Sequence, residues 1–290
     1  ANAAKFQNFK AKTIVSDYGF SNMNSKISHQ SSWKKSVTQV YDEASISLSW
    51  TEILKETCNK ANIEYMTTPY DLSFISKLSN YVNAWKIGSG DITYHEIIEK
   101  ISKEKKPILI ATGASNIKEI ENAIHIIRKN NNEIVLMQCN TNYTASIENL
   151  KYIQLNVLKL YAKMFPECIL GLSDHTHGHV SVLGSISLGA RVIEKHFTDD
   201  NNREGPDHKF AMNPKTWREM VERSRELELC LGNDNKEVMF NEKDTVIVQR
   251  RAIRASEKIE KGTALKYEHF TFLRPCPENA LPPYEYVKLI

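Results

Sequence analysis

The chain has 290 residues, of which 41% are hydrophobic and 25% are charged, and its formal net charge is +3. These values describe an ordinary globular protein with one large domain, or with one large and one small domain. They argue against a nucleic-acid-binding protein, because no basic stripe interleaves with aromatic residues. They also argue against a membrane protein, because no apolar run approaches the ~18 residues of a spanning helix and no signal peptide is visible.

Strands and helices alternate along the chain. Apolar runs predict strands that begin near residues 3, 63, 84, 107, 133, 168 and 191. Helical spacing, with Ser49 and Ser115 as expected N-caps, predicts helices at 49–60, 72–78, 94–103, 115–127, 150–161, 180–190 and 214–232. This alternation indicates an α/β fold with a parallel sheet that helices cover on both faces.

Several finer expectations follow from the same spacing. The helix at 49–60 should turn Ile53, Leu54 and Thr57 inward, and the helix at 115–127 should do the same with Ile117, Ile120, Ile124 and Ile127. Residues 10–45 are polar and weakly periodic, and we expect a lid over a site there. Trp33, Val37 and Tyr41 have the spacing that anchors a short helix in it.

The spacing of the elements fits a TIM (β/α)8 barrel, although only seven strands are found. The chain begins at Ala1, without an initiator Met and almost directly on a strand-like run. We therefore expect the first strand and its helix to be missing. An open barrel exposes unpaired strand edges, so the chain alone is expected to be poorly soluble and inactive. The alternative is an open doubly wound sheet, which the absence of a GxGxxG turn disfavours.

Composition divides the chain into three parts. Residues 1–232 are expected to form the barrel, and the polar stretch 233–249 is typical of a linker. Residues 250–290 contain short β-like pieces, a Lys-Gly turn and the pair Arg274-Pro275. We interpret them as the start of a second, small domain that Ile290 cuts short.

The number and spacing of the cysteines indicate the cellular compartment of the protein. They lie at positions 58, 139, 168, 230 and 276, are odd in number and form no CxxC pair. Three of them lie in or beside apolar runs. The pattern predicts buried free thiols and a cytoplasmic location.

The stretch from Cys168 to His208 contains the first candidate site. Two apolar runs in it end in histidines, His175 and His196. The ends of adjacent parallel strands lie about 5 Å apart, so both imidazoles can point into one space. Two neutral imidazoles make half of a divalent-metal site, with positions left for water or substrate. A hydrogen-bonded histidine pair without metal is the alternative.

A second candidate site consists of polar residues at the other strand ends, where a barrel carries its chemistry. Two lysines, several hydroxyls and the turn at Gly88 and Gly90 would hold a phosphate or carboxylate through charge-assisted hydrogen bonds. The strand-end residues are Lys5, Gln7, Thr67, Thr68, Lys86, Ser89, Asp91, Thr112, Asn140, Thr141, Asn142, Tyr143, Ser173, Asp174 and Lys195.

Short motifs, in order along essentially the whole chain, resemble the sialic acid synthase family. They are KFQ at 5–7, KIGSGD at 86–91, ATGAS at 111–115, GLSDHT at 171–176, EKHFT at 194–198, GPDHKFAMNP at 205–214 and RRAI…LRP at 250–275. This family includes legionaminic and pseudaminic acid synthases, which condense phosphoenolpyruvate with an N-acetylated hexosamine. The resemblance implies a TIM barrel followed by an antifreeze-like (SAF) domain, in a domain-swapped homodimer.

The resemblance also implies a role for each matching residue. His175 and His196 would bind a divalent metal, with manganese expected and magnesium or cobalt as alternatives. Phosphoenolpyruvate would be held by Lys5, Thr68, Lys86, Ser89, Thr141 and Ser173. The sugar would be held by Gln7, Tyr143, Asp207 and, from the other protomer, Arg274. Asp91, at a position where relatives often carry Glu, would manage protons or water.

Two departures from the family keep other functions open. The chain lacks the segment that carries the family's first-strand glutamate, and its antifreeze-like part stops early. A non-catalytic fragment or a sugar-binding protein of the same fold is therefore one alternative. A phosphoenolpyruvate-condensing barrel that acts on a sugar phosphate is the other, although it needs a second phosphate pocket with more arginines than this sequence indicates.

Overall fold

The computed structural model describes residues 1–23, 30, 33–205 and 207–290. Contacts divide the chain into two compact units, Ala1–Leu231 and Gly232–Ile290. The first unit holds a large sheet and the second a two-stranded sheet. Among the described helices, none combines the length and the apolar character that crossing a bilayer requires.

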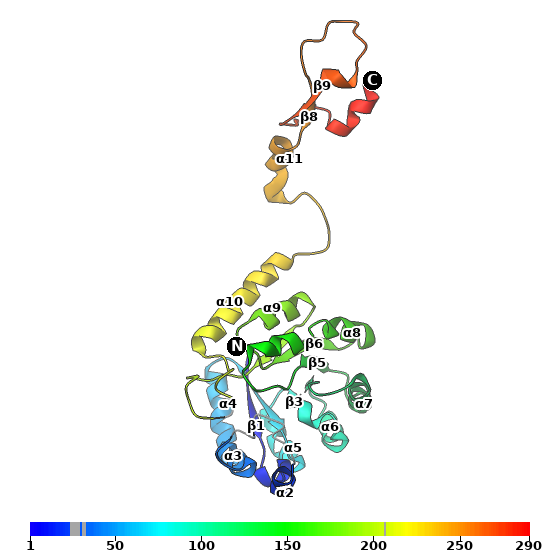
Figure 1. Ribbon diagram of the computed structural model, residues 1–290. Helices are drawn as coiled ribbons and strands as arrows, with labels where there is room; N and C mark the ends of the chain where they lie inside the picture. Colours follow the sequence, from blue (N-terminus) through cyan, green and yellow to red (C-terminus); the bar gives the residue numbers. More distant parts are fainter. Residues whose placement is uncertain (24–29, 31–32, 206) are drawn as a thin grey trace. The chain divides into compact units, whose positions relative to one another are not determined.

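Seven parallel strands form one sheet in the first unit, and their order follows the chain (Figure 1). The strands are β1 (Ala3–Asn8), β2 (Glu64–Pro69), β3 (Trp85–Ile87), β4 (Ile108–Ala111), β5 (Ile134–Cys139), β6 (Ile169–Asp174) and β7 (Val192–Lys195). Their starting points confirm the predicted strands. A doubly wound sheet reverses its order at a switch point, so the sequential order excludes that alternative and confirms the TIM-barrel type.

The sheet curls until its two edges come close. Among the described strands, β1 and β7 are the edges of the hydrogen-bonded sheet. Near the C-terminal ends of these strands, Lys5 Nζ on β1 nevertheless lies 3.1 Å from Glu194 Oε1 on β7. Side chains from the first and last strands therefore share one space, as they do in the mouth of a barrel.

Helices connect the strands and cover the outer face of the sheet (Figure 1). In the first unit they are α1 (Ala11–Ile14), α2 (Asp17–Ser21), α3 (Val37–Ala44), α4 (Thr51–Lys60), α5 (Leu72–Leu78), α6 (His95–Ser102), α7 (Ile117–Arg128), α8 (Val157–Met164), α9 (Val180–Ser187) and α10 (Pro214–Leu231). The stretch 10–45, where a lid was expected, contains α1, α2 and α3, and residues 24–29 and 31–32 of it lie outside the described residues. The short helix expected there is α3, which contains Val37 and Tyr41 but not Trp33.

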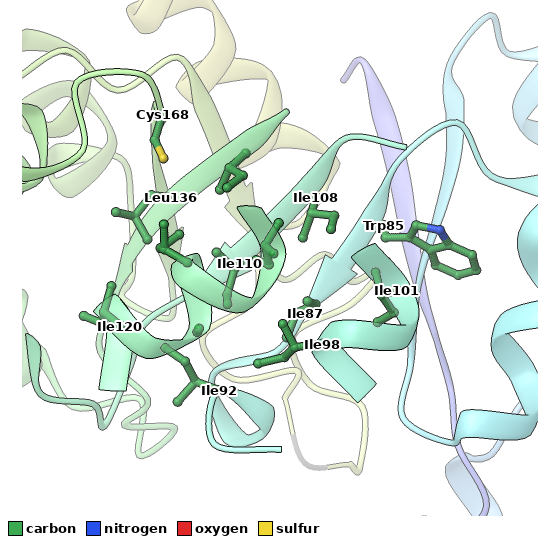
Figure 2. Packing of buried hydrophobic residues seen from close by; sticks show 14 of the residues in the cluster. Trp85, Ile87, Ile92, Ile98, Ile101, Ile108, Ile110, Ile120, Leu136 and Cys168 are labelled. Carbon is green, nitrogen blue, oxygen red and sulfur yellow. The ribbon is translucent and has the colours of Figure 1, made fainter. Parts of the chain in front are cut away.

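The main hydrophobic core lies between the sheet and these helices. Strand side chains such as Trp85, Ile110 and Leu136 are at most 1% exposed. Figure 2 shows them in one cluster with Ile98 and Ile101 of α6 and Ile120 of α7. Burial of this much apolar surface is the dominant favourable term in folding, so this layer holds the sheet in shape.

The expected orientation of α4 was wrong for Ile53 and Thr57, which are exposed, and right for Leu54, which packs against the core. Residues Leu48–Trp50 form a 3-10 turn that Ser47 caps, and the α-helix begins only at Thr51. The buried residues of the helix are Thr51 and Cys58, so the inward stripe runs through Thr51, Leu54 and Cys58 at the three- and four-residue spacing of one helix face.

Two further helices differ from expectation. Asn116, not Ser115, caps α7, and Ile117 is 37% exposed because it occupies the first helical position; Ile120, Ile124 and Ile127 are buried as predicted. The helix expected over 150–161 is broken. A 3-10 stretch at Ile147–Tyr152 and helix α8 are separated by Gln154, whose φ of 52° no α-helix continues.

The second unit contains α11 (Lys243–Gln249), which lies inside the stretch expected to be a linker, and strands β8 (Ala252–Ala255) and β9 (Phe270–Leu273). The two strands pair antiparallel. All five cysteines of the chain are free, and Cys58, Cys139 and Cys168 are buried as predicted.

Candidate functional site

Strand register places the predicted anion-binding residues on one face of the sheet. Because side chains alternate along a strand, partners in register share a face. Gln7 pairs with Thr68, and Thr67 pairs with Trp85, so Thr68 and Lys86 are in register. On the other side of the sheet Cys139 pairs with Ser173, and Ser173 pairs with Glu194. This inner face is opposite to the one that Figure 2 shows.

Glu194 lies between the two predicted lysines. Its Oε1 is 3.1 Å from Lys5 Nζ, its Oε2 is 3.6 Å from Lys86 Nζ, and Ser173 Oγ donates to Oε1 at 3.5 Å. Burial alone would raise the pKa of Glu194, but the two ammonium groups outweigh it and lower the pKa to about 2. The carboxyl is therefore ionised at neutral pH, and strands β1, β3 and β7 are tied together.

Lys86 and Asp91 have shifted pKa values in this pocket. The Lys86 side chain is 3% exposed, and burial lowers its pKa while Glu194 raises it. Burial raises the pKa of Asp91 to about 6, against the opposing effect of the Lys86 ammonium. A buried lysine beside a carboxyl that titrates near neutrality is typical of functional sites.

Small and hydroxyl residues form a cradle beside the lysines. Ser89 Oγ accepts a hydrogen bond from the Gly113 amide at 2.9 Å. A Cβ on Gly113 would lie 2.4 Å from Thr141 Cγ2 and 3.0 Å from Cys139 Sγ, so a larger residue would displace these cradle side chains. Within the described residues, the buried Thr68 Oγ1 has no hydrogen-bond partner. A buried hydroxyl without a partner is costly, which suits a bound ligand.

The two predicted histidines do come together. The ring centroids of His175 and His196 are 5.2 Å apart. The carbonyl oxygen of Asn140 lies 2.8 Å from His175 Nδ1, and Asp207 Oδ2 lies 3.3 Å from His196 Nδ1. Because both Nδ1 atoms face acceptors, both Nε2 atoms remain for a ligand.

The donor set suits a divalent cation with open positions. Burial and the nearby His196 lower the pKa of His175 to about 4, so its imidazole is neutral, as metal binding requires. Within the described residues, no group of three or more His, Cys, Asp or Glu side chains is arranged around a metal position. Two imidazoles leave the remaining positions to water or substrate.

An aromatic wall closes one side of the histidine pair. Phe210, 2% exposed, lies with its ring centroid 6.0 Å from His175 and 5.2 Å from His196. Tyr143, one of the predicted sugar contacts, has its ring centroid 4.3 Å from that of His175. The wall excludes water from one side of the imidazoles and restricts their rotation.

The other predicted sugar contacts are only partly gathered here. Gln7 Nε2 donates to the Tyr70 hydroxyl at 3.2 Å, and Asp207 lies against His196. A Cβ on Gly88 would lie 2.8 Å from the Tyr70 oxygen, so Tyr70 requires the glycine. Arg274 is an exposed residue of the second unit.

The family now follows from comparison with known proteins. Residues 1–236 match the NeuB family. The chain belongs to the NeuB family. The N,N'-diacetyllegionaminic acid synthase of Campylobacter jejuni is 32% identical over 293 residues, which cover 98% of this chain and 85% of that protein. The enzyme of the same name from Legionella pneumophila is 31% identical over 283 residues, with 95% and 77% covered.

Solved structures agree with this NeuB assignment. The spore coat polysaccharide biosynthesis protein SpsE of Bacillus subtilis is 28% identical, with a TM-score of 0.65 over 100% of this chain and 81% of that one. The N-acetylneuraminic acid synthetase of Leptospira borgpetersenii has a TM-score of 0.72 over 85% of this chain and 80% of that one. At 24% identity this second likeness shows the fold alone.

Sequence reasoning missed three residues of this NeuB pocket. Glu194 precedes Lys195 in a predicted strand end, but its place between Lys5 and Lys86 depends on the curl of the sheet. Phe210 lies inside the motif at 205–214, which gave it no role of its own, and Tyr70 gave no signal except its place beside a predicted strand end. A carboxyl on the same face as a lysine of a distant strand is detectable only once the register is known.

Proposed function

We propose that this NeuB protein is a nonulosonic (sialic-type) acid synthase. It condenses phosphoenolpyruvate with N-acetylmannosamine or a related acetamido-deoxy hexose and releases phosphate. One observation carries the proposal: Glu194 of β7 joins the lysine pair, and the histidine pair lies at the end of the same strand. His196 directly follows β7 and is two residues from Glu194, about 6–7 Å along the chain, so an anion and a reacting carbonyl can be neighbours.

Phosphoenolpyruvate carries a phosphate and a carboxylate, and the inner face offers a cation for each. Lys5 and Lys86 supply charge, while the cradle supplies hydroxyl and amide donors. The residues proposed to contact phosphoenolpyruvate are Lys5, Thr68, Lys86, Ser89, Thr141 and Ser173. The unpartnered Thr68 hydroxyl is the strongest single support for a ligand at this place.

His175 and His196 would hold a divalent cation, Mn2+ by resemblance to the family and Mg2+ or Co2+ as alternatives. The neutral imidazole of His175 and the acceptors beside both Nδ1 atoms, which direct the Nε2 atoms to a ligand, fit such an ion. When bound, the cation acts as a Lewis acid that polarises the aldehyde oxygen of the open-chain sugar. The aromatic wall keeps bulk water away from that side of the pocket.

The residues of the chain perform the remaining steps. The lysines hold phosphoenolpyruvate so that its C3 attacks the sugar aldehyde carbon, which forms the new C–C bond and leaves cationic character at C2. Asp91, with a pKa of about 6, is ionised at neutral pH and takes a proton from the water that adds at C2. The proton passes from Asp91 to the alkoxide of the former aldehyde, which becomes a hydroxyl. The C2–O bond to the phosphate then breaks while the added hydroxyl loses its proton to the leaving phosphate and becomes the keto oxygen, and Lys5 and Lys86 stabilise the departing phosphate.

Gln7, Tyr143 and Asp207 are proposed to hold the sugar, together with Arg274 from the other protomer of a domain-swapped homodimer. Tyr143 lies directly beside the histidine pair, where the sugar aldehyde must lie. The names of the relatives point to acceptors with acetamido groups. N-acetylmannosamine, a 2,4-diacetamido-6-deoxy hexose and a 6-deoxy-altrose type are the candidates.

Phosphate release tests the proposal. The full chain is incubated with phosphoenolpyruvate, Mn2+ and each candidate sugar, and mass spectrometry identifies the product. We expect one of the acetamido sugars to give phosphate and a nine-carbon keto acid. We expect neither product when a chelator is added or when the acceptor is a sugar phosphate. Phosphate release only with a sugar phosphate would point to the other class of phosphoenolpyruvate-condensing barrel. Binding without turnover would point to a non-catalytic role.

A further inference from the structure

A buried ion pair lies directly behind the histidine pair. Lys195 and Asp174 are partners in the ladder between β6 and β7, and their side chains are 1% and 0% exposed. His175 follows Asp174, and His196 follows Lys195. Since side chains alternate along a strand, the ion pair lies on the helix side while Ser173, Glu194 and the imidazoles belong to the pocket side.

The ion pair is fully hydrogen-bonded within the protein. Lys195 Nζ donates to Asp174 Oδ2 at 2.7 Å and to the carbonyls of Thr176 at 2.7 Å and Gly178 at 3.0 Å. Asp174 in turn accepts from the Thr176 amide at 3.0 Å, from the Thr176 hydroxyl and from the Ser181 hydroxyl. All three ammonium protons therefore have acceptors, and Lys195 is not the anion-binding residue that its strand-end position suggested.

Stability does not explain this arrangement. Desolvation of two charges offsets most of their attraction, and apolar pairs of similar volume are often as stable. The hydrogen bonds of the pair instead fix the geometry of the surrounding backbone. Lys195 ties the end of β7 to the end of β6 and to the turn that follows His175, while Ser181 at the start of α9 holds the carboxylate. The backbone on both sides of His175, and that directly before His196, is thereby fixed.

We propose that Asp174 and Lys195 are a positioning pair, which sets the spacing and direction of His175 and His196 so that both imidazoles reach one divalent cation. The inference rests on the proposed function, because that function assigns the cation. Neither residue of the pair touches the cation or the substrates.

The test separates positioning from stability. In the double variant Asp174→Asn, Lys195→Met both charges are removed with little change in volume, so the chain is expected to fold with a Tm near that of wild type. Mn2+ affinity, measured by electron paramagnetic resonance and calorimetry, should fall roughly 10- to 100-fold, the range found for supporting groups of metal sites. Affinity for inorganic phosphate, measured without metal, should stay unchanged because Lys5 and Lys86 are untouched.

A folded double variant with wild-type Mn2+ affinity would overturn the proposal. If the double variant does not fold, Ser181→Ala decides, because it removes one donor to Asp174 and keeps both charges. It should weaken Mn2+ binding less than the double variant but measurably, with an unchanged circular dichroism spectrum; unchanged binding overturns the proposal. If the wild-type chain binds Mn2+ but shows no turnover, the proposed function is contradicted and the positioning role is not. If the wild-type chain binds none of Mn2+, Mg2+ and Co2+, the proposed function and the positioning role are both contradicted.

Discussion

The two faces of β3 differ in chemistry although both are buried. On the outer face, Trp85 and Ile87 are at most 1% exposed and pack against helices. Lys86 lies between them in the chain, is 2% exposed and points to the opposite face, beside Glu194. Burial therefore does not distinguish structural from functional residues in this protein; the kind of partner does.

The energetic consequences of burial have opposite signs on the two faces. Each apolar side chain on the outer face stabilises the fold by about 1.5–3 kcal/mol when it leaves water. Each charge on the inner face costs free energy to bury and is tolerated only with a partner. Variants of the inner-face charges should consequently lose binding more than stability, and variants of the apolar outer-face side chains should do the reverse.

The largest effect is expected on the inner face, from His175→Ala. Removal of one of two protein ligands should abolish Mn2+ binding and reduce turnover to background, while the unfolding free energy changes little. Paramagnetic resonance and phosphate release measure the two quantities. His125→Ala, which removes an exposed histidine of α7, is the matched control. Full turnover of His175→Ala in chelator-treated buffer would refute the site.

The outer face is tested by Leu136→Ala on β5. Leu136 is 0% exposed, so the change leaves a cavity and should lower the unfolding free energy by about 2–5 kcal/mol. Urea unfolding measures it, and Leu136→Met, which conserves volume, should cost less than about 1.5 kcal/mol. KM for phosphoenolpyruvate should stay at the wild-type value in folded protein. A large change in KM would mean that the two faces are not independent.

Much of the fold was predictable because parallel strands buried on both sides are nearly continuous apolar runs. The pairing of His175 with His196 was predictable for a related reason, since neighbouring parallel strands end at one edge of the sheet. Helix orientation was less predictable. The inward stripe of α4 contains Thr51 and Cys58 while Ile53 is exposed, and apolar spacing alone does not mark a threonine and a cysteine as the buried positions.

The part of the site that joins distant strands was not predictable. Glu194 contacts Lys5 only because the sheet curls through all of its strands and brings β7 back to β1. Lys195 and Asp174 looked like pocket residues, but the alternation of side chains turns both away from it. The face on which a side chain lies depends on strand register, and a shift of one residue moves every side chain of the strand to the opposite face.

A smaller loss is expected from Lys86→Ala. One charge-assisted contact to an anion contributes about 1.5–3 kcal/mol, so KM for phosphoenolpyruvate should rise roughly 10- to 150-fold. Removal of the buried charge also removes its desolvation cost, and stability should change less than in Leu136→Ala. Steady-state kinetics and urea unfolding measure both. Lys159→Ala, an exposed lysine of α8, is the control, and an unchanged KM would make Lys86 structural.

The smallest effect is a pH-dependent gain of stability from Asp91→Asn. Burial raises the pKa of Asp91 to about 6 in the folded chain, above the ordinary value of 3.8. The folded state thus binds the proton more tightly, and the stability from this group is complete below pH 3.8 and lost as pH rises through 6. Asparagine imitates the protonated form at every pH. The variant should match wild type near pH 4 and exceed it by about 1–2 kcal/mol at pH 7, with an allowance for partial exposure.

Urea unfolding at several pH values between 4 and 7 measures this difference. Turnover provides the second arm, because Asp91→Asn lacks the carboxylate that accepts a proton from water and should be slow throughout the range. If the difference in stability between the variant and wild type stays constant with pH, burial does not raise the pKa of Asp91. If the variant has normal turnover and the expected gain in stability, Asp91 is a buried charged group that takes no part in the reaction. A charge that is retained for function destabilises the fold, so its removal should make the protein more stable and less active.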